Sequence, residues 1–260
     1  MDASTQFIWI VGDPITQVKA PQVMNPRYAL AGDRLCVLPA SVHSDDLRRV
    51  FDAARRIGNL RGWIVTVPHK PTIAAWLDEL SPAARLAGVV NAVRFRDGKA
   101  FGDLFDGVGF TAGLAARGFG IDGCAVLLLG AGGVGSAMAL ALAQAGASRV
   151  AIHDIDMARA RSLVERLSGL SGTGTRFEAS DASMTRGFDL IANASPVGMA
   201  GDPRTPIDTT LLEPSHTVAE VVMSPEWTPL LRAAQQKGCA IHPGSQVLAG
   251  QLDRLLDFFR

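Results

Sequence analysis

The segment LLLGAGGVGSA at 127–137 constrains the fold more than any other part of the chain. Its glycines form the spacing G-x-G-x-x-G directly after an apolar strand and directly before an alanine-rich helix. In that context the first glycine permits a sharp turn, the second lets backbone N–H groups approach a pyrophosphate, and the third lets helix and strand pack closely. Such a turn also occurs in α/β proteins that bind no nucleotide, but the order strand, turn, helix, strand favours a dinucleotide site. The residues expected to contact the cofactor here are Gly130, Gly132, Gly133, Val134 and Gly135.

An acidic side chain ends the next predicted strand, RVAIHD at 149–154. At that place Asp154 can accept hydrogen bonds from a ribose 2′-hydroxyl, and its charge would repel a 2′-phosphate. The first arginine after this strand is Arg159, and both features favour NAD over NADP. The alternative is that Asp154 or Asp156 caps the helix expected at 157–168. We expect one of the two to do so and the other to remain for the ribose.

Short apolar runs alternate with segments of helical spacing along almost the whole chain, which predicts a mostly parallel sheet with helices on its faces. In the first part we expect strands at 7–12, 34–40, 62–67 and 89–95, and helices at 21–31 and 44–57, the latter with Ser44 as N-cap. In the second part we expect helices at 107–117, 134–145, 157–168, 227–237 and 245–259, and strands at 124–130, 149–154, 188–194 and 217–222.

The Asp97-Gly98 pair predicts a tight turn, and the glycine-rich segment at 101–110 follows it. A domain junction is expected there. The first domain would then comprise residues 1–101, completed by the C-terminal segment 238–260. The second, nucleotide-binding domain would comprise residues 102–237.

Composition excludes several classes of protein. The chain has 260 residues, and its 25 basic and 25 acidic side chains give a formal net charge of zero. A nucleic-acid partner is not expected, because it would require a basic face that neutralises phosphates. No stretch reaches the ~18 uninterrupted apolar residues of a membrane span, and the first residues do not resemble an export signal. Three widely separated cysteines are typical of a reduced, cytoplasmic protein, and the five histidines lack metal-ligand spacing, so no metal site is expected.

Only four of the 25 basic residues are lysines, and one of them, Lys70, follows a buried strand and a proline turn. Two segments are expected near it: VVNAV, which carries Asn91, and FDGVGF, which carries Asp106. A lysine beside a carboxylate can donate a proton to an alkoxide, while the carboxylate holds and polarises the amine. A surface ion pair is the alternative, and these residues alone leave both interpretations open.

A series of ordered blocks resembles the shikimate/quinate dehydrogenase family over nearly the full length of the chain. They are VGDPITQVKAPQVMN (11–25), VTVPHK (65–70), VVNAV (89–93), DGVGF (106–110), GAGGVGSA (130–137), NASPVGM (193–199) and, near the end, VAEVVMSPEWTPLLRAA (218–234) with GSQVLAGQ (244–251). The resemblance implies an α/β fold with an N-terminal mixed-sheet catalytic domain, a Rossmann-like nucleotide-binding domain and an active site in the cleft between them. It also implies reversible NAD(P)-dependent hydride transfer between a ring secondary alcohol and its ketone.

The resemblance assigns roles by motif position. The family's catalytic pair matches Lys70 and Asp106. The residues that contact the substrate's hydroxyls match Thr66, Asn91 and Gln251. On the cofactor side, NASPVGM resembles the loop that approaches the nicotinamide, so contacts are expected from Asn193, Met199 and Gly244. For Met199, ordinary core packing is the alternative.

Several polar positions of the family pattern carry other residues here. The two serines that bind the substrate carboxylate are replaced by Gln17 and Lys19. The asparagine before VTVPHK is Ile64, the Asn-Thr before the catalytic aspartate is Leu104-Phe105, and a tyrosine is Met223. With Gln17, Lys19, Phe105 and Met223 among its contacts, the pocket should bind a triol acid poorly, because hydroxyls would be desolvated without partners. Lys19 either binds a carboxylate by charge or is solvated at the pocket rim, and the scarcity of lysine favours the first.

These observations predict a cytoplasmic dehydrogenase of this family that prefers NAD, with NADP as the second candidate, and that has an altered substrate pocket. Its partner is expected to be a small, carboxylated molecule, with no membrane or nucleic acid involved, and its state a monomer or homodimer. One alternative is a genuine shikimate or quinate dehydrogenase. Another, of a different class, is a non-catalytic nucleotide-sensing regulatory protein, against which the retention of both Lys70 and Asp106 argues.

Overall fold

The computed structural model describes residues 2–16, 18–170, 172 and 174–260, so the predicted contact residue Gln17 lies outside the described residues. The chain forms two compact units: Met1–Phe105 with Leu252–Arg260, and Asp106–Gln251. The predicted boundaries lie between residues 101 and 102 and between residues 237 and 238, so both observed boundaries differ from them. Backbone hydrogen bonds explain the difference, because β6 (Lys99–Asp103) pairs within the first sheet and β12 (Ala240–His242) pairs within the second.

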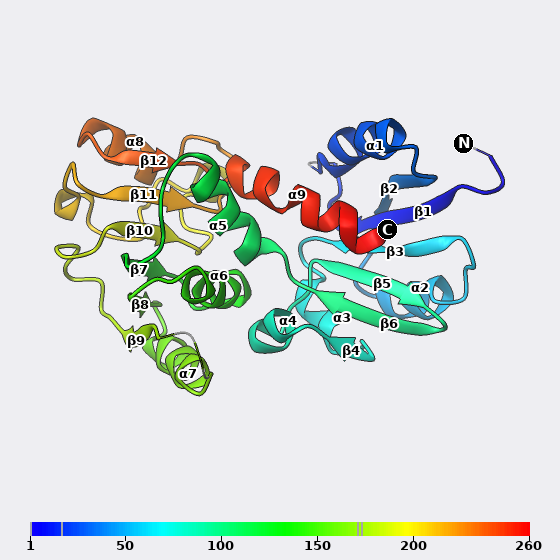
Figure 1. The fold of residues 1–260 in the computed structure, drawn as a ribbon, viewed down its shortest axis with the longest axis horizontal. Helices are drawn as coiled ribbons and strands as arrows, with labels where there is room; N and C mark the ends of the chain where they lie inside the picture. Colours follow the sequence, from blue (N-terminus) through cyan, green and yellow to red (C-terminus); the bar gives the residue numbers. More distant parts are fainter. Residues whose placement is uncertain (1, 17, 171, 173) are drawn as a thin grey trace. The chain divides into compact units, whose positions relative to one another are not determined.

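The first unit contains a mixed six-stranded sheet in the order β2-β1-β3-β5-β6-β4 (Figure 1). The strands are β1 (Gln6–Gly12), β2 (Leu35–Ser41), β3 (Leu60–Val65), β4 (Glu79–Leu80), β5 (Ala92–Arg96) and β6. The helices of this unit are α1 (Ala20–Ala31), α2 (Leu47–Ala54), α3 (Lys70–Ala74) and α4 (Pro82–Ala87). β1 runs parallel to β2 and β3, whereas β5 runs antiparallel to β3 and β6.

One apolar core of this unit joins β1 and β3 to α1 and to the last turns of α9 (Ser245–Phe259). Ile64 and Phe105, which occupy polar positions of the family pattern, are both buried in this core. The ring of Phe105 meets that of Phe258 edge-on at 5.4 Å between centroids, and the adjacent Leu104 is 1% exposed. These side chains therefore contribute apolar burial to the first unit.

The second unit contains a six-stranded sheet in the order β12-β11-β10-β7-β8-β9, in which every neighbouring pair is parallel (Figure 1). The strands are β7 (Ala125–Leu129), β8 (Arg149–His153), β9 (Arg176–Ala179), β10 (Leu190–Asn193), β11 (Thr217–Glu220) and β12. The helices are α5 (Asp106–Ala116), α6 (Gly133–Gln144), α7 (Met157–Ser168), α8 (Pro229–Gln236), the short 3-10 turns η1 (Met199–Gly201) and η2 (Thr209–Leu211), and the first half of α9. The predicted α/β class, with one mixed and one Rossmann-like parallel sheet, is confirmed.

Some local predictions differ from the structure. α2 begins at Leu47 rather than at 44, and its N-cap is Asp46, so the prediction that Ser44 is the N-cap is wrong. The backbone at 43–47 instead forms successive turns, with Asp46 N–H donating to the His43 carbonyl at 3.1 Å. Asp97 and Gly98 both have positive φ and form the predicted tight turn between β5 and β6. None of the helices in the described part of the chain is long and apolar enough to cross a membrane.

A buried histidine lies on β12. His242 is 2% exposed, and its ring meets the ring of Phe110 on α5 edge-on at 6.0 Å between centroids. Neither ring nitrogen has a hydrogen-bond partner among the described residues. Burial, reinforced by the charge of Arg117, lowers the pKa of His242 to about 4. The ring is therefore neutral in the folded protein throughout the physiological pH range.

This histidine makes the second unit sensitive to acid. Between pH 6.5 and 4 the unfolded chain binds a proton at His242 that the folded chain excludes, so stability falls as the pH falls. Because the pKa is lowered from 6.5 to about 4, the free energy of unfolding should be lower by roughly 3 kcal/mol below pH 4 than at neutral pH. In urea unfolding, the free energy of unfolding should decrease from pH 7 to pH 4.5 by about 2 kcal/mol less in His242→Leu than in the wild type. Equal losses in the two proteins would contradict this assignment.

Candidate functional site

Three strands of the second sheet end beside one another and carry the predicted cofactor residues. β7 is followed by Gly130, β8 by Asp154, and β10 ends at Asn193. β7 pairs with both β8 and β10, so their carboxyl ends share one edge of the sheet. The crevice at the carboxyl ends of parallel strands is where open α/β sheets bind their ligands.

The glycine turn after β7 leaves no room for side chains at two of its positions. Gly130 has φ +116°, and a Cβ there would lie 3.0 Å from the backbone of Ala194 and of Ser195. A Cβ at Gly135 would collide with the Gly130 carbonyl oxygen. Gly132 differs, because a Cβ there would meet nothing within 4 Å. The first and third glycines therefore serve packing, whereas the second faces open space.

The start of α6 is suited to an anion. Its N-cap is Gly132, which is exposed and offers no side-chain cap. The first amides of a helix have no intrahelical acceptors and carry the positive end of the helix dipole. Here they belong to Gly133, Val134 and Gly135, and the first two are half-buried. The open space at Gly132 and these amides fit the pyrophosphate of a dinucleotide.

The two aspartates after β8 have different tasks. Asp156 caps α7, since its Oδ1 accepts from the Ala158 N–H at 3.0 Å. Asp154 accepts from the Ala131 N–H at 2.8 Å through Oδ2 and from the Asp156 N–H at 2.9 Å through Oδ1. The prediction that one of the two caps the helix is confirmed, and Asp154 is the one attached to the glycine turn. Ile155 between them is fully exposed.

The segment after β10 is folded around a buried amide. Asn193 is 0% exposed, and its Oδ1 accepts from Ser195 N–H at 3.0 Å and from Ser195 Oγ at 2.7 Å. Its Nδ2 donates to the Val197 carbonyl at 3.3 Å. We call residues 193–199 the nicotinamide loop, after the family loop that they resemble. Met199 at its end is 49% exposed, so ordinary core packing does not explain this methionine.

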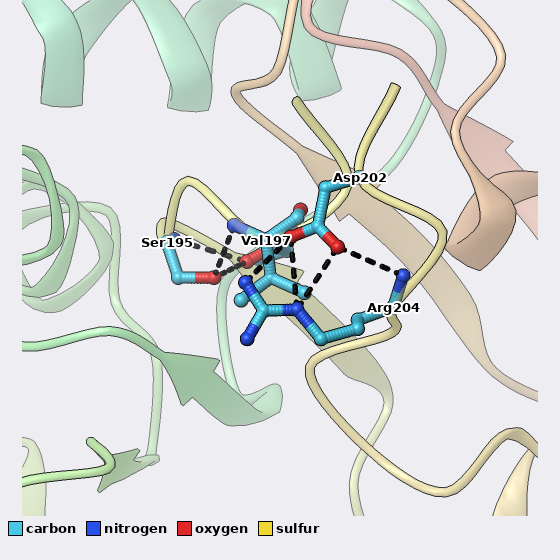
Figure 2. Close-up of polar contacts among 5 residues, drawn as sticks. Ser195, Val197, Asp202 and Arg204 are labelled. Atoms are coloured by element: carbon cyan, nitrogen blue, oxygen red, sulfur yellow. Dashed lines mark hydrogen bonds and ion pairs between the residues drawn. The ribbon is translucent and has the colours of Figure 1, made fainter. Parts of the chain in front are cut away.

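An ion pair between Asp202 and Arg204 lies in the segment that follows this loop. Figure 2 shows this pair together with Ser195 and Val197 of the loop. The guanidinium of Arg204 donates from Nε to Oδ1 and from Nη2 to Oδ2 of Asp202, both at 2.9 Å. Hydrogen bonds from Arg204 lower the pKa of Asp202 to about 2, so this carboxylate stays charged at any physiological pH.

Sequence reasoning missed a buried carboxyl group at the end of β11. Glu220 is 0% exposed, and its Oε2 accepts from Thr228 Oγ1 at 3.0 Å. Burial raises the pKa of Glu220 to about 7, and hydrogen bonds from Thr228 and Asn193 oppose that rise only in part. The signal in the sequence was an acidic residue inside the apolar run TVAEVV at 217–222.

The remaining predicted residues of the second unit lie on separate elements. Gly244 packs against the backbone of Val221 and Val222, and Met223 is 47% exposed. The carbonyl of Ser224, next to Met223, accepts a 3.0 Å hydrogen bond from the amide of Ala200, which directly follows the nicotinamide loop. Asp106 begins α5 and is 8% exposed. Gln251 is 9% exposed and packs on α5 at Gly109.

The first unit holds the other predicted residues. Lys70 is half-buried at the start of α3, and Thr66 is half-buried directly after β3. Asn91 is 5% exposed, and its Oδ1 accepts from the Phe105 N–H at 3.0 Å, so it ties β5 to the end of the β6 segment. Lys19 is exposed and is the N-cap residue of α1.

The sequence and the fold of known proteins match this chain. Residues 10–93 match the model of the shikimate dehydrogenase substrate-binding domain. The shikimate dehydrogenase (NADP(+)) of Rubrobacter xylanophilus is 37% identical over 257 residues, which is 96% of this chain and 89% of that protein.

The chain belongs to the shikimate dehydrogenase family. It is accordingly an NAD(P)-dependent oxidoreductase that acts on a CH–OH group of a small-molecule substrate. Two solved structures of related proteins fit it closely. Shikimate 5-dehydrogenase from Listeria monocytogenes in complex with shikimate and NAD has a TM-score of 0.87 at 29% identity, covering 100% of this chain and 93% of that one. The ligand-free 5-ketofructose reductase of Gluconobacter sp. strain CHM43 has a TM-score of 0.85 at 28% identity, covering 98% and 92%.

The glycine turn of this family member yields a paired prediction. Gly135→Ala should lower the stability of the second unit by about 1–3 kcal/mol, because its Cβ collides with a backbone oxygen. Gly132→Ala should leave stability unchanged, because its φ of −74° suits alanine and its Cβ meets no protein atom. It should nevertheless weaken NADH binding at least about tenfold, because the pyrophosphate approaches there.

Thermal unfolding and a fluorescence titration with NADH measure the two effects separately. Unchanged NADH affinity in Gly132→Ala would show that the dinucleotide binds elsewhere.

Proposed function

We propose that this protein is an NAD-preferring dehydrogenase that interconverts a cyclic secondary alcohol carrying a carboxylate and the corresponding ketone, in a pocket altered relative to that for shikimate. The observation that carries the proposal is the carboxylate of Asp154, fixed by the amide of Ala131 at the end of β8. Around it lie the dinucleotide turn and the nicotinamide loop, and the chain retains the family's lysine and aspartate.

The charge around Asp154 supports NAD. Each of its oxygens accepts one backbone hydrogen bond and keeps a lone pair for a ribose hydroxyl. A 2′-phosphate would meet this negative charge and the exposed apolar side chain of Ile155. The first arginine, Arg159, lies 3.5 Å from the carboxylate of Asp156 and is therefore already paired.

Lys70 and Asp106 are proposed to handle the proton. The bound dinucleotide supplies or accepts the hydride at the carbinol carbon. In the direction of reduction, the Lys70 ammonium donates a proton to the oxygen of the former carbonyl, and in oxidation the neutral amine takes it back. Asp106, which matches the carboxylate of the family's catalytic pair, is proposed to orient the amine. Asn91 Oδ1 accepts from the Phe105 amide, and its match to the family pattern supports a contact between this side chain and a substrate hydroxyl.

The substrate pocket is proposed to be less polar than that of shikimate dehydrogenases. Ile64, Leu104 and Phe105 occupy polar family positions and are buried, so they offer no hydrogen bonds to hydroxyls. Lys19 lies at the N-terminus of α1, where its charge and the helix dipole would both attract a carboxylate. The similarity to a protein named 5-ketofructose reductase supports the view that this fold serves more than one hydroxylated substrate.

Two alternatives remain in competition. The first is genuine shikimate or quinate dehydrogenase activity, which the sequence similarity to shikimate dehydrogenase (NADP(+)) favours. The second is a nucleotide sensor without catalysis, for which the retained Lys70 and Asp106 would have no use.

Cofactor preference follows from the Asp154 charge. The wild type should bind NADH at least about tenfold more tightly than NADPH in a fluorescence titration, because hydrogen bonds to a charged group contribute about 1.5–3 kcal/mol. Asp154→Asn should reduce this ratio by removing the charge, whereas Asp156→Asn, which can still cap α7, should leave it unchanged. Tighter binding of NADPH by the wild type would refute the proposed preference.

Turnover tests the roles of the proton-handling residues and the pocket. Lys70→Met should lower the rate by about 10²–10⁴ on the best substrate of a panel while leaving NADH binding intact. The panel should hold shikimate, quinate and less hydroxylated cyclic hydroxy acids, and the last group should give the highest kcat/KM. Lys99→Met, at an exposed lysine 3.8 Å from Glu79, is the matched control and should keep full activity. Robust shikimate turnover would overturn the altered pocket and support the first alternative.

A further inference from the structure

Glu220 is the one carboxyl group that the described residues bury completely at the carboxyl edge of the second sheet, and the proposed reaction does not use it. It ends β11 in register with Asn193 at the end of β10. Residues in register on neighbouring strands project from the same face of a sheet, so the two side chains are neighbours. Both are 0% exposed.

The hydrogen bonds of this carboxyl group are incomplete. Oε2 accepts from Thr228 Oγ1 at 3.0 Å, and Asn193 contributes a further hydrogen bond to the carboxyl group. Oε1 is buried and has no partner of normal geometry among the described residues. A buried carboxylate with an unsatisfied oxygen is costly, and protonation relieves that cost. Burial accordingly raises the pKa of Glu220 to about 7.

Both partners of Glu220 also hold the nicotinamide loop. Asn193 binds Ser195 twice and Val197 once, as described above. Thr228 faces the loop at Gly198, where an added Cβ would lie 3.4 Å from the Thr228 Cβ. Thr228 also accepts from the Leu231 N–H at 3.2 Å and so caps α8. If the Glu220 carboxyl group moves, both Asn193 and Thr228 can move with it, and each of them contacts the loop.

We propose that Glu220 is a positioning residue, which holds the nicotinamide loop in its binding geometry while protonated and loosens it when ionised. This inference rests on the proposed function, because it assumes that the loop receives the nicotinamide. The physical reason is that a charged carboxylate gains hydration when the loop opens, whereas a protonated one gains little. Cofactor affinity should therefore decrease as the pH rises through neutrality.

No other charge around Glu220 accounts for such a dependence. β10 carries no titratable side chain. His242 on β12 is in register with Ala219, so it projects from the opposite face of the sheet. On the α8 side, Arg232 and Glu226 are exposed, and they bond to the Trp227 carbonyl and to Ser245 respectively. Among the described residues, no other charge contributes to the pKa shift of Glu220.

The test is a fluorescence titration with NADH between pH 6 and pH 8.5 on the full chain. The Kd of the wild type should rise at least about threefold over this range, since one linked proton permits up to tenfold per pH unit above the pKa. Glu220→Gln keeps an acceptor for Thr228 but carries no charge, so its Kd should stay within about twofold. Glu165→Gln, which removes an exposed carboxylate on α7, should behave as the wild type. The same pH dependence in Glu220→Gln and the wild type would overturn the inference.

A second pair of variants covers the case in which Glu220→Gln fails to fold, as judged by circular dichroism. Thr228→Val removes the donor that favours the carboxylate, so the midpoint of the pH dependence should move upward, and Thr228→Ser should restore it. An unmoved midpoint would again overturn the inference. If the wild type binds NADH without Glu220 affecting its pH profile, the proposed function survives alone. If it binds neither NADH nor NADPH at any pH, both proposals fail.

Discussion

The contact between the start of α6 and the end of β7 is the constraint on which the second unit depends. At Gly135 the helix approaches the carbonyl of Gly130 so closely that a side chain cannot intervene. The first turn of α6 also lies near the loop after β10, because a Cβ on Gly130 would come within 3.0 Å of the backbone of Ala194. The helix amides, the Asp154 carboxylate and the nicotinamide loop thereby share one edge of the parallel sheet. A single packing requirement thus assembles groups from three separate parts of the chain.

Polar groups at that edge are distributed by their degree of burial. The half-buried groups, such as the amides of Gly133 and Val134 and the carboxylate of Asp154, keep some contact with solvent. The fully buried ones, Asn193, Thr228 and Glu220, bond mainly to one another and to the loop backbone. Buried polar groups must be paired within the protein, and such networks define one geometry for the loop that they hold. The incomplete pairing of Glu220 makes this network dependent on protonation.

The proposed change of the substrate pocket involves residues that lie in the core of the first unit. Ile64 and Phe105 belong to the apolar cluster that packs against the end of α9. Asn91, directly before β5, accepts from the Phe105 amide and so joins the start of β5 to the segment after β6. This combination is compatible with a retained reaction and a changed substrate.

The sequence alone determined the order of most strands and helices, the glycine turn, the family and the identity of the residues that carry the proposed chemistry. These signals are local, since strand and helix periodicity, turn residues and motif spacing act over a few residues. Tertiary structure decided what depends on contacts between distant segments. It placed β6 in the first sheet and β12 in the second, gave the cap of α7 to Asp156 and the glycine turn to Asp154, and buried Glu220 against Asn193 and Thr228. Burial and hydrogen-bond partners across a parallel sheet come from residues far apart in the chain, so no local pattern specifies them.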